Sequence, residues 1–238
     1  RAAQQDALQP GRLAQLQDRR ETDGDDGQRR HPAQPGRHLR GGGAGVEKYA
    51  AAWGFGADLS IPLTVTPSTY PANDSAAMTA MAGIGQASVK ATPLQMAMVA
   101  ATVANDGEQM APYIISQTLD ADLQVVSTTK PTVARTPIDS QTAATLTGLM
   151  QQAVSSGTGT SAQVAGVSVA GKTGTAQTGS DDGGPITWFI GFAGTDINNP
   201  TVAVAVVLDG GEQIPTTGTG GSVAGPIAAS VIDAAVDQ

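Results

Sequence analysis

The chain has 238 residues, a formal net charge of −8 and no cysteine, so its fold cannot depend on disulfides. It contains no run of eighteen apolar residues and no signal-peptide pattern, so we expect no transmembrane helix from these residues. No His, Cys and Asp residues fall at metal-ligand spacing, so we expect neither a metal nor another cofactor.

Residues 1–45 differ in composition from the rest of the chain. They hold eight of the thirteen basic residues, both histidines and none of the eight aromatic residues. They show no apolar periodicity, so we predict that this segment is disordered. Six acidic residues are interspersed, which argues against a nucleic-acid-binding tail. Two explanations for this composition remain: a natural linker, or translation in the wrong frame. We prefer the second, because GC-rich DNA read out of register yields Arg, Pro, Gly and Ala.

Residues 46–238 hold fifteen acidic and five basic residues and nearly all of the long apolar runs, which is enough for one domain with a substantial core. Because the chain begins with Arg1, we expect a fragment or a processed product. Val46–Trp53 is typical of a short helix that ends at Gly54. The following segment, Ile61–Tyr70, is punctuated by prolines and predicts loop rather than strand.

Two longer helices are predicted in the middle of the chain. The first has Thr92 as N-cap, Pro93 at the first helical position and Gln95 completing a capping box. Its residues 94–104 are apolar nearly all round, which indicates a buried helix. The second is predicted over residues 136–155. Its inner positions are expected to be Ile138, Leu146, Leu149, Met150 and Val154.

Three strands and a covering helix are predicted in the last third of the chain. The strands fall at about 167–177, 186–193 and 202–208, and the short polar links between them favour an antiparallel meander. The helix is expected over about 222–236, with apolar residues at helical spacing toward the sheet. This order of elements predicts an α+β fold, with an antiparallel sheet packed against helices.

The first of these strands carries the most informative motif, Lys172-Thr-Gly-Thr175. Alternation along a strand places Val167, Val169 and Gly171 on one side and Ser168, Ala170 and Lys172 on the other. A bound carboxylate can accept hydrogen bonds from Lys172, Thr173 and Thr175, and Gly174 has no side chain to keep a ligand off the backbone. The alternative is an ordinary strand with a solvated lysine.

The same letters also match a phosphate-binding loop over Gly166–Thr173, with Asp209 after a later apolar strand as a candidate magnesium ligand. Such a loop follows a buried strand and opens a helix. Here the four residues Val167–Ala170 favour strand, and the residues after Thr173 are a poor helix start. A nucleotide-binding module is therefore kept only as a disfavoured alternative.

Residues 46–238 resemble the C-terminal half of the transpeptidase domain of class B penicillin-binding proteins, and among these the mycobacterial PbpA group. The resemblance rests on five segments in the order found in that family. They are Gly83-Ile-Gly-Gln86, Thr92-Pro-Leu-Gln-Met96, Ser156-Gly-Thr-Gly159, Gly171-Lys-Thr-Gly-Thr175 and Trp188-Phe-Ile-Gly-Phe192. The fold implied is an incomplete penicillin-binding transpeptidase fold.

The resemblance implies peptidoglycan cross-linking by serine acyl transfer. Lys172, Thr173, Gly174 and Thr175 would bind the stem peptide or a β-lactam, and the backbone N–H of Thr175 would be an oxyanion donor. The implied partners are stem peptides and β-lactams rather than nucleic acid. The implied location is the extracytoplasmic face of the bacterial plasma membrane, with any membrane anchor in a part that precedes these residues.

The sequence departs from the family because it contains no Ser-x-Asn motif, and its single Ser-x-x-Lys is Ser127-Thr-Thr-Lys130. Pro131 directly follows that lysine and disfavours the helix that the family's nucleophile requires, so we expect Ser127 to be a solvated loop serine. We therefore expect this chain to lack its nucleophile and to be catalytically inactive, leaving a non-catalytic β-lactam- or peptide-binding fragment as the alternative. We also expect Val202–Leu208 to be an apolar edge strand that promotes aggregation.

Overall fold

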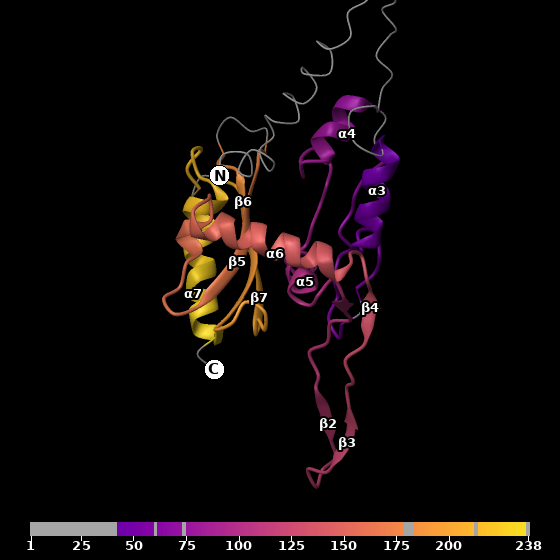
Figure 1. Ribbon diagram of the computed structural model, residues 1–238. Helices are drawn as coiled ribbons and strands as arrows, with labels where there is room; N and C mark the ends of the chain where they lie inside the picture. Colours follow the sequence, from indigo (N-terminus) through magenta and orange to yellow (C-terminus); the bar gives the residue numbers. More distant parts are fainter. Residues whose placement is uncertain (1–41, 60, 73–74, 179–182, 212–213, 237–238) are drawn as a thin grey trace, which may run out of the picture. The chain divides into compact units, whose positions relative to one another are not determined.

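A computed structural model describes most of the chain from Gly42 onward and divides it into two compact units (Figure 1). The first contains residues up to Lys48 and Pro71–Val89, and the second contains Tyr49–Tyr70 and Lys90–Gln238. The predicted disorder of residues 1–41 lies outside the described residues. The residues that the structure describes are 42–59, 61–72, 75–178, 183–211 and 214–236.

The first unit contains the beginning of helix α3, Gly42–Ala52, and all of the short helix α4, Ala76–Ala82. Helix α3 begins four residues before the predicted Val46, so the prediction of disorder is wrong for residues 42–45. Helix α4, which the sequence analysis did not predict, starts where the Ser75 side chain accepts from the N–H of Met78. It ends in a Schellman motif, in which Gly85 takes a positive φ of 78°.

In the second unit, helix α5, Pro93–Ala104, begins as predicted, because the Thr92 side chain accepts from the N–H of Gln95. The predicted capping box is only half formed. The N–H of Thr92 donates to the buried hydroxyl of Ser68, at 3.0 Å, while the Gln95 side chain donates to the Trp53 carbonyl, at 2.9 Å. The helix start is thereby tied to the loop that follows α3.

Helix α6 runs over Ser140–Ser155, about four residues later than predicted, because Asp139 rather than Thr136 is its N-cap. An Asp139 carboxylate oxygen accepts from the N–H of Thr142 at 2.7 Å. Hydrogen bonding to the Thr142 side chain, and next to its backbone N–H, lowers the pKa of the Asp139 carboxyl group. At the other end, a Cβ at Gly157 would lie 2.8 Å from the Ala153 carbonyl, so only glycine fits after the last turn.

The sheet of the second unit is the predicted antiparallel meander, in the order β5-β6-β7. Its strands are Ser168–Ala176, Ile186–Gly194 and Val202–Leu208, so all three predictions are confirmed to within one residue at each end. The central strand pairs with β5 from Ser168↔Gly194 to Ala176↔Ile186 and with β7 from Thr187↔Leu208 to Ala193↔Val202. The α+β fold class is confirmed.

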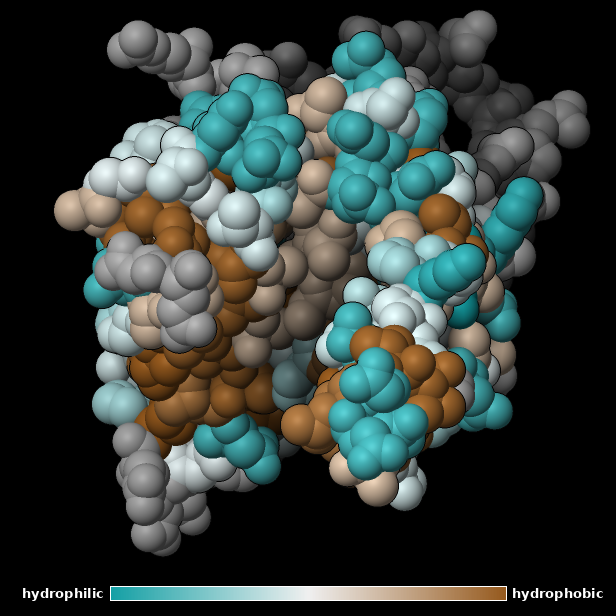
Figure 2. Space-filling view, turned by 90° about the horizontal axis from the view of Figure 1, so that it is seen from below, coloured by the Kyte–Doolittle hydropathy of each residue, from teal (hydrophilic) through white to brown (hydrophobic). Residues whose placement is uncertain are grey.

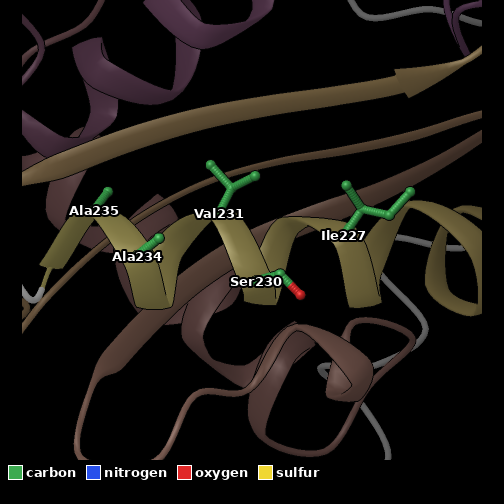
Figure 3. Close-up of a pocket in the computed structure, with 5 residues that line it drawn as sticks. All are labelled: Ile227, Ser230, Val231, Ala234 and Ala235. Carbon is green, nitrogen blue, oxygen red and sulfur yellow. The ribbon is translucent and has the colours of Figure 1, made fainter.

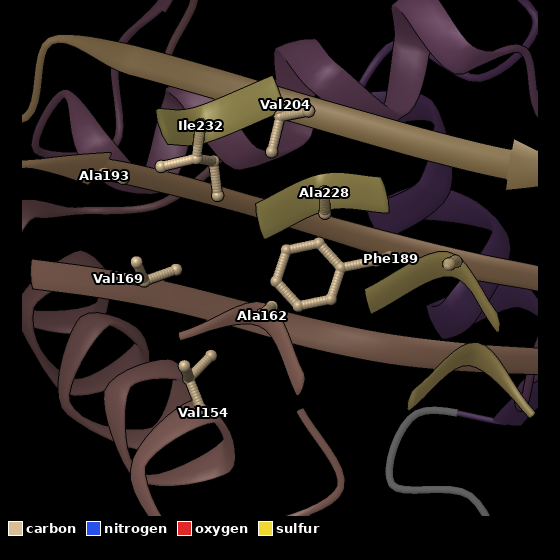
Figure 4. Close-up of a cluster of buried hydrophobic side chains, with 9 residues drawn as sticks. Val154, Ala162, Val169, Phe189, Ala193, Val204, Ala228 and Ile232 are labelled. Carbon is tan, nitrogen blue, oxygen red and sulfur yellow. The ribbon is translucent and has the colours of Figure 1, made fainter. Parts of the chain in front are cut away.

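Helices cover both faces of this sheet. One face packs against helix α7, Gly225–Val236, and its buried cluster centres on Phe189 (Figure 4). The opposite face packs against α5 and α6, and its cluster includes Ala170 and Phe192. The α7 cluster consists of Val154, Ala162, Val169, Phe189, Ala193, Val204, Ala224, Ala228 and Ile232. We call these two sides the α7 face and the α5 face.

The last helix has an irregular start that the sequence analysis did not predict. A π-helical turn, η3, occupies Gly220–Ala224 before α7 begins. Thr219 caps this turn, with its side chain accepting from the N–H of Ser222 while the Ser222 hydroxyl accepts from the N–H of Thr219. This capping box fixes the position of Gly220 at the beginning of the turn.

Two small antiparallel sheets join α5 to α6, and neither was predicted. Strands β1 (Gln109–Met110) and β4 (Val133–Arg135) pair near the helices, whereas β2 (Gln117–Leu119) and β3 (Val125–Thr128) form an outlying hairpin (Figure 1). Every residue of the hairpin strands is exposed. On a different part of the molecule, Figure 2 shows hydrophobic surface on the side of α7 and the three-stranded sheet. On α7, the side chains of Ile227 and Val231 are exposed.

Candidate functional site

Strand β5 presents the predicted binding motif at one edge of the sheet, because in the described residues it pairs only with β6. Val169 belongs to the cluster on the α7 face and Ala170 to the cluster on the α5 face. Side chains alternate along a strand, so Thr173 and Thr175 point to the α7 face while Lys172 points to the α5 face. The alternation predicted for this strand is confirmed.

The Lys172 ammonium reaches the strand edge although its side chain leaves from the α5 face. Its Nζ donates to the carbonyl oxygen of Thr173 at 2.6 Å. The residue is exposed as a whole, yet the protein atoms around the ammonium desolvate it and lower the pKa of Lys172. An ammonium has three donors, so this bond leaves others for a ligand.

The hydroxyls of Thr173 and Thr175 are each held by a neighbouring segment. The Thr173 hydroxyl pairs with that of Thr158 at 2.7 Å, and Thr158 lies in the loop after α6. The Thr175 hydroxyl accepts from the N–H of Gly220 at 3.1 Å. Backbone groups of alternate strand residues point the same way, so those of Thr173 and Thr175 share a direction.

Glycines let neighbouring groups approach this strand closely. A Cβ at Gly171 would lie 2.2 Å from the Phe189 ring, which passes over it on the α7 face. Gly220 lies over Gly174, where a Cβ on Gly220 would be 2.4 Å from the Gly174 carbonyl oxygen. The missing side chain of Gly220 therefore allows η3 to lie directly against the backbone of β5 at Gly174.

The phosphate-loop alternative is not supported by this geometry. Residues Ser168–Ala176 form one continuous strand that includes Lys172 and Thr173, so no helix opens after Thr173. The nucleotide-binding module over Gly166–Thr173 is therefore rejected. Asp209 follows β7 as predicted, but the loop that a magnesium nucleotide requires is not formed.

Ser127 lies on strand β3 of the exposed hairpin, and not in the loop that we predicted. Its hydroxyl pairs with that of Thr118 across the hairpin at 2.6 Å. The residue is exposed and is not at the start of a buried helix, which agrees with the expectation that it is solvated.

The structure also shows a shallow apolar groove of about 460 Å³ on the outer surface of α7 (Figure 3). Its lining has one hydroxyl group and no charged side chain, so it offers nothing to recognise a carboxylate. In the described part of the chain no group of three His, Cys, Asp or Glu side chains is placed to hold a metal ion. The groove is lined by Ile227, Ser230, Val231, Ala234 and Ala235.

Thr158 and Gly220 were missed as functional candidates by the sequence analysis. Thr158 lies within the segment Ser156–Gly159, which carried part of the resemblance but was given no role. Gly220 stands in a Thr-Gly-Thr-Gly-Gly run just before an apolar helix. Such a run indicates close backbone approach, and this signal could have marked the segment as a neighbour of the binding strand.

Comparison with known proteins identifies the family of the chain. The model of the penicillin binding protein transpeptidase domain matches residues 40–233. The peptidoglycan D,D-transpeptidase PbpA of Mycolicibacterium smegmatis is 44% identical over 202 residues, which cover 82% of this chain and 40% of that protein. PbpA of Mycobacterium tuberculosis H37Rv is 40% identical over 202 residues, covering 83% of this chain and 40% of the relative. The chain thus spans about two fifths of these relatives.

Solved structures show the same relationship. Penicillin-binding protein A of M. tuberculosis, as a penicillin G acyl-enzyme complex, superposes with a TM-score of 0.72 at 37% identity, covering 82% of this chain and 44% of that one. The D,D-transpeptidase domain of a peptidoglycan glycosyltransferase from Eggerthella lenta gives 0.71 at 28% identity, covering 81% and 48%. The predicted resemblance is confirmed, and the chain belongs to the penicillin-binding protein transpeptidase domain family.

Proposed function

We propose that this chain supplies the substrate-binding strand of a peptidoglycan D,D-transpeptidase. The observation that carries the proposal is the placement of Lys172-Thr-Gly-Thr175 on edge strand β5, with two hydroxyls held on one face and an ammonium at the edge. An extended peptide can lie along such an edge, and its terminal carboxylate can accept hydrogen bonds from the hydroxyls. The relatives' names and acylated structures support the same substrate class.

In the reaction we propose, a serine that is not among the residues of this chain attacks the carbonyl carbon of the penultimate D-alanine. The bond to the terminal D-alanine breaks, the acyl group stays on the serine, and an amine of a neighbouring stem peptide then takes it up. The backbone N–H of Thr175 is proposed as one oxyanion donor, a role worth about 3 kcal/mol in comparable acyl-transfer sites. Lys172 contributes positive charge beside the bound carboxylate.

We further propose that this chain alone is catalytically inactive. The sequence has no Ser-x-Asn motif, and its only Ser-x-x-Lys lies on the exposed hairpin. Intact-mass spectrometry after incubation with benzylpenicillin tests this, and we expect the mass of the chain to stay unchanged. A covalent adduct would contradict the proposal, and its loss in Ser127→Ala would identify Ser127 as the nucleophile.

The binding role can be tested without acylation. We expect N-acetyl-D-alanyl-D-alanine to change the fluorescence of Trp188, because Trp188 on β6 is the pairing partner of Gly174 on β5. The C-terminal amide of the same dipeptide should bind at least several-fold more weakly, because it lacks the charge that ammonium and hydroxyl donors recognise. Equal affinity for the two peptides would contradict a carboxylate site on β5.

The cellular setting follows from the family and is proposed on the same footing. The partners are peptidoglycan stem peptides and β-lactams, and the site of action is the extracytoplasmic face of the plasma membrane. In the described residues no helix has the length and apolar character needed to cross a bilayer. For the residues before 40, where the match to the family model begins, a frame error is still our hypothesis. A Ser-x-Asn codon pattern in another frame of the coding DNA would support it.

A further inference from the structure

The loop after α6 holds Thr158 firmly against the binding strand. The N–H of Gly159 donates to the Ala153 carbonyl at 2.9 Å, which ties the loop to the end of α6. On the other side, the Thr158 carbonyl lies so close to Gly221 that a Cβ there would be 2.2 Å away, and the Ser161 hydroxyl donates to the Gly221 carbonyl. Thr158 is therefore fixed from both sides by helix ends.

The direction of the hydrogen bonds decides what the two strand hydroxyls can offer a ligand. A threonine hydroxyl has one proton and two lone pairs. The N–H of Gly220 can only donate, so the Thr175 oxygen is the acceptor in that bond. For Thr173, either it or Thr158 donates in the 2.7 Å contact.

The binding of a carboxylate determines which of the two threonines donates to the other. An ionised carboxylate only accepts, so it binds Thr173 when the Thr173 proton is directed outward. Thr158 must then donate to the Thr173 oxygen, and a chain of two bonds runs from Thr158 through Thr173 to the ligand. Each bond in such a chain polarises the next and strengthens it.

We propose that Thr158 is a positioning residue, whose hydroxyl donates to Thr173 and directs the Thr173 proton at the terminal carboxylate of the ligand. The proposal rests on the proposed function of β5 as a carboxylate-binding strand. It assigns a role to the Ser156–Gly159 segment that packing alone does not require, because Thr158 itself is exposed. Thr158 touches no ligand; it acts through Thr173.

The test compares binding of N-acetyl-D-alanyl-D-alanine and its C-terminal amide to the 238-residue chain, read from tryptophan fluorescence in dilute solution. Thr158→Val keeps the shape of the side chain and removes the donor, so we expect about fivefold to tenfold weaker binding of the free acid. Binding of the amide should change little. Thr158→Ser restores the hydroxyl and should restore the preference for the acid.

Thr160→Val is the matched control, since Thr160 is an exposed threonine two residues further along the chain, at the start of the 3-10 helix Thr160–Ala162. It should leave both affinities as in the wild type. Thr158→Ala provides a second removal of the hydroxyl if valine disturbs the loop, and retained binding of the amide shows that the site is intact. A merely structural role would weaken acid and amide equally.

The outcomes separate this inference from the proposed function. If the wild-type chain prefers the acid and the valine and alanine variants keep that preference, the role of Thr158 is wrong while the site stands. Equal loss of both ligands in these variants also overturns it. If the wild-type chain shows no preference for the acid, the proposed function fails first and the role of Thr158 fails with it.

Discussion

Two segments of this chain match lysine-containing motifs of the penicillin-binding protein family, but their structural surroundings differ. Lys172-Thr-Gly-Thr175 lies on β5 of a sheet that is covered by helices on both faces. Ser127-Thr-Thr-Lys130 begins on β3, in a hairpin whose strand residues are all exposed. The two motifs differ in that neighbouring segments restrict the backbone and the hydroxyls of the first motif and leave the second exposed.

The restriction around β5 is specific. Phe189 fills the space above Gly171, Gly220 approaches Gly174, and Thr158 and Gly220 hold the two threonine hydroxyls. In the hairpin, the Ser127 hydroxyl forms a hydrogen bond with the hydroxyl of Thr118, which is itself exposed. Substitutions in the two regions should therefore differ in effect, and the following predictions test that difference.

The largest expected effect is that of Gly171→Val. A Cβ at this position would lie 2.2, 2.8 and 3.0 Å from atoms of the fully buried Phe189 ring, so the variant must displace that ring. We expect a loss of about 3 kcal/mol or more in the free energy of unfolding, measured by urea denaturation. Gly148→Ala is the control, because a Cβ at Gly148 in α6 meets nothing within 4 Å. Equal stability of the two variants would contradict the packing of β5.

Self-association through the edge of β7 is the next effect. Within the described residues β7 pairs only with β6, and most of its side chains are half-buried, so its open edge can pair with another chain. We expect the chain to self-associate with rising concentration in sedimentation velocity, and Val207→Lys to reduce this. Val126→Lys, on the exposed hairpin, should not. A monodisperse wild-type chain at high concentration would contradict the prediction.

Removing the charge of Lys172 should change the free energy of unfolding by a smaller amount, and this change should depend on pH. Desolvation lowers the pKa of Lys172 in the folded state below the ordinary value of 10.5. At neutral pH the side chain is charged, so its full desolvation energy lowers the stability of the fold. This destabilisation disappears as the pH rises from the lowered pKa of Lys172 through 10.5. We expect Lys172→Met to raise stability at pH 7 by less than about 1 kcal/mol, and the gain to vanish above pH 10.5. Thermal unfolding at both pH values measures it, and a gain that grows with pH would contradict the assignment.

The smallest effect is expected in the hairpin. Ser127→Ala and Lys130→Ala should each change the free energy of unfolding by less than about 0.5 kcal/mol, because both side chains are exposed. Neither should alter the affinity for N-acetyl-D-alanyl-D-alanine. Loss of peptide binding in either variant would show that the hairpin, and not β5, carries the site.

The elements that the sequence predicted well are those with strong local signals. Thr92-Pro93 marked the start of α5, and the alternation around Lys172 placed β5 and the side of each of its residues. The short polar links between the predicted strands indicated the antiparallel order in which β5, β6 and β7 follow one another. In each case the local preference and the tertiary packing agree.

The features that were missed depend on contacts between distant segments. The capping box at Thr92 was only half right because Gln95 finds the Trp53 carbonyl, 42 residues away. The contacts of Thr158 with Thr173 and of Gly220 with Thr175 span 15 and 45 residues, so no local pattern shows them. The hairpin strands were missed because they are short and exposed, with no apolar face to give a periodic signal.

A crystal structure of the chain with N-acetyl-D-alanyl-D-alanine tests the central claim most directly. We predict that the terminal carboxylate lies within hydrogen-bond distance of the Thr173 and Thr175 hydroxyls, with the peptide extended along β5. The peptide bound instead in the apolar groove of α7, or on the hairpin that carries Ser127, would contradict the account.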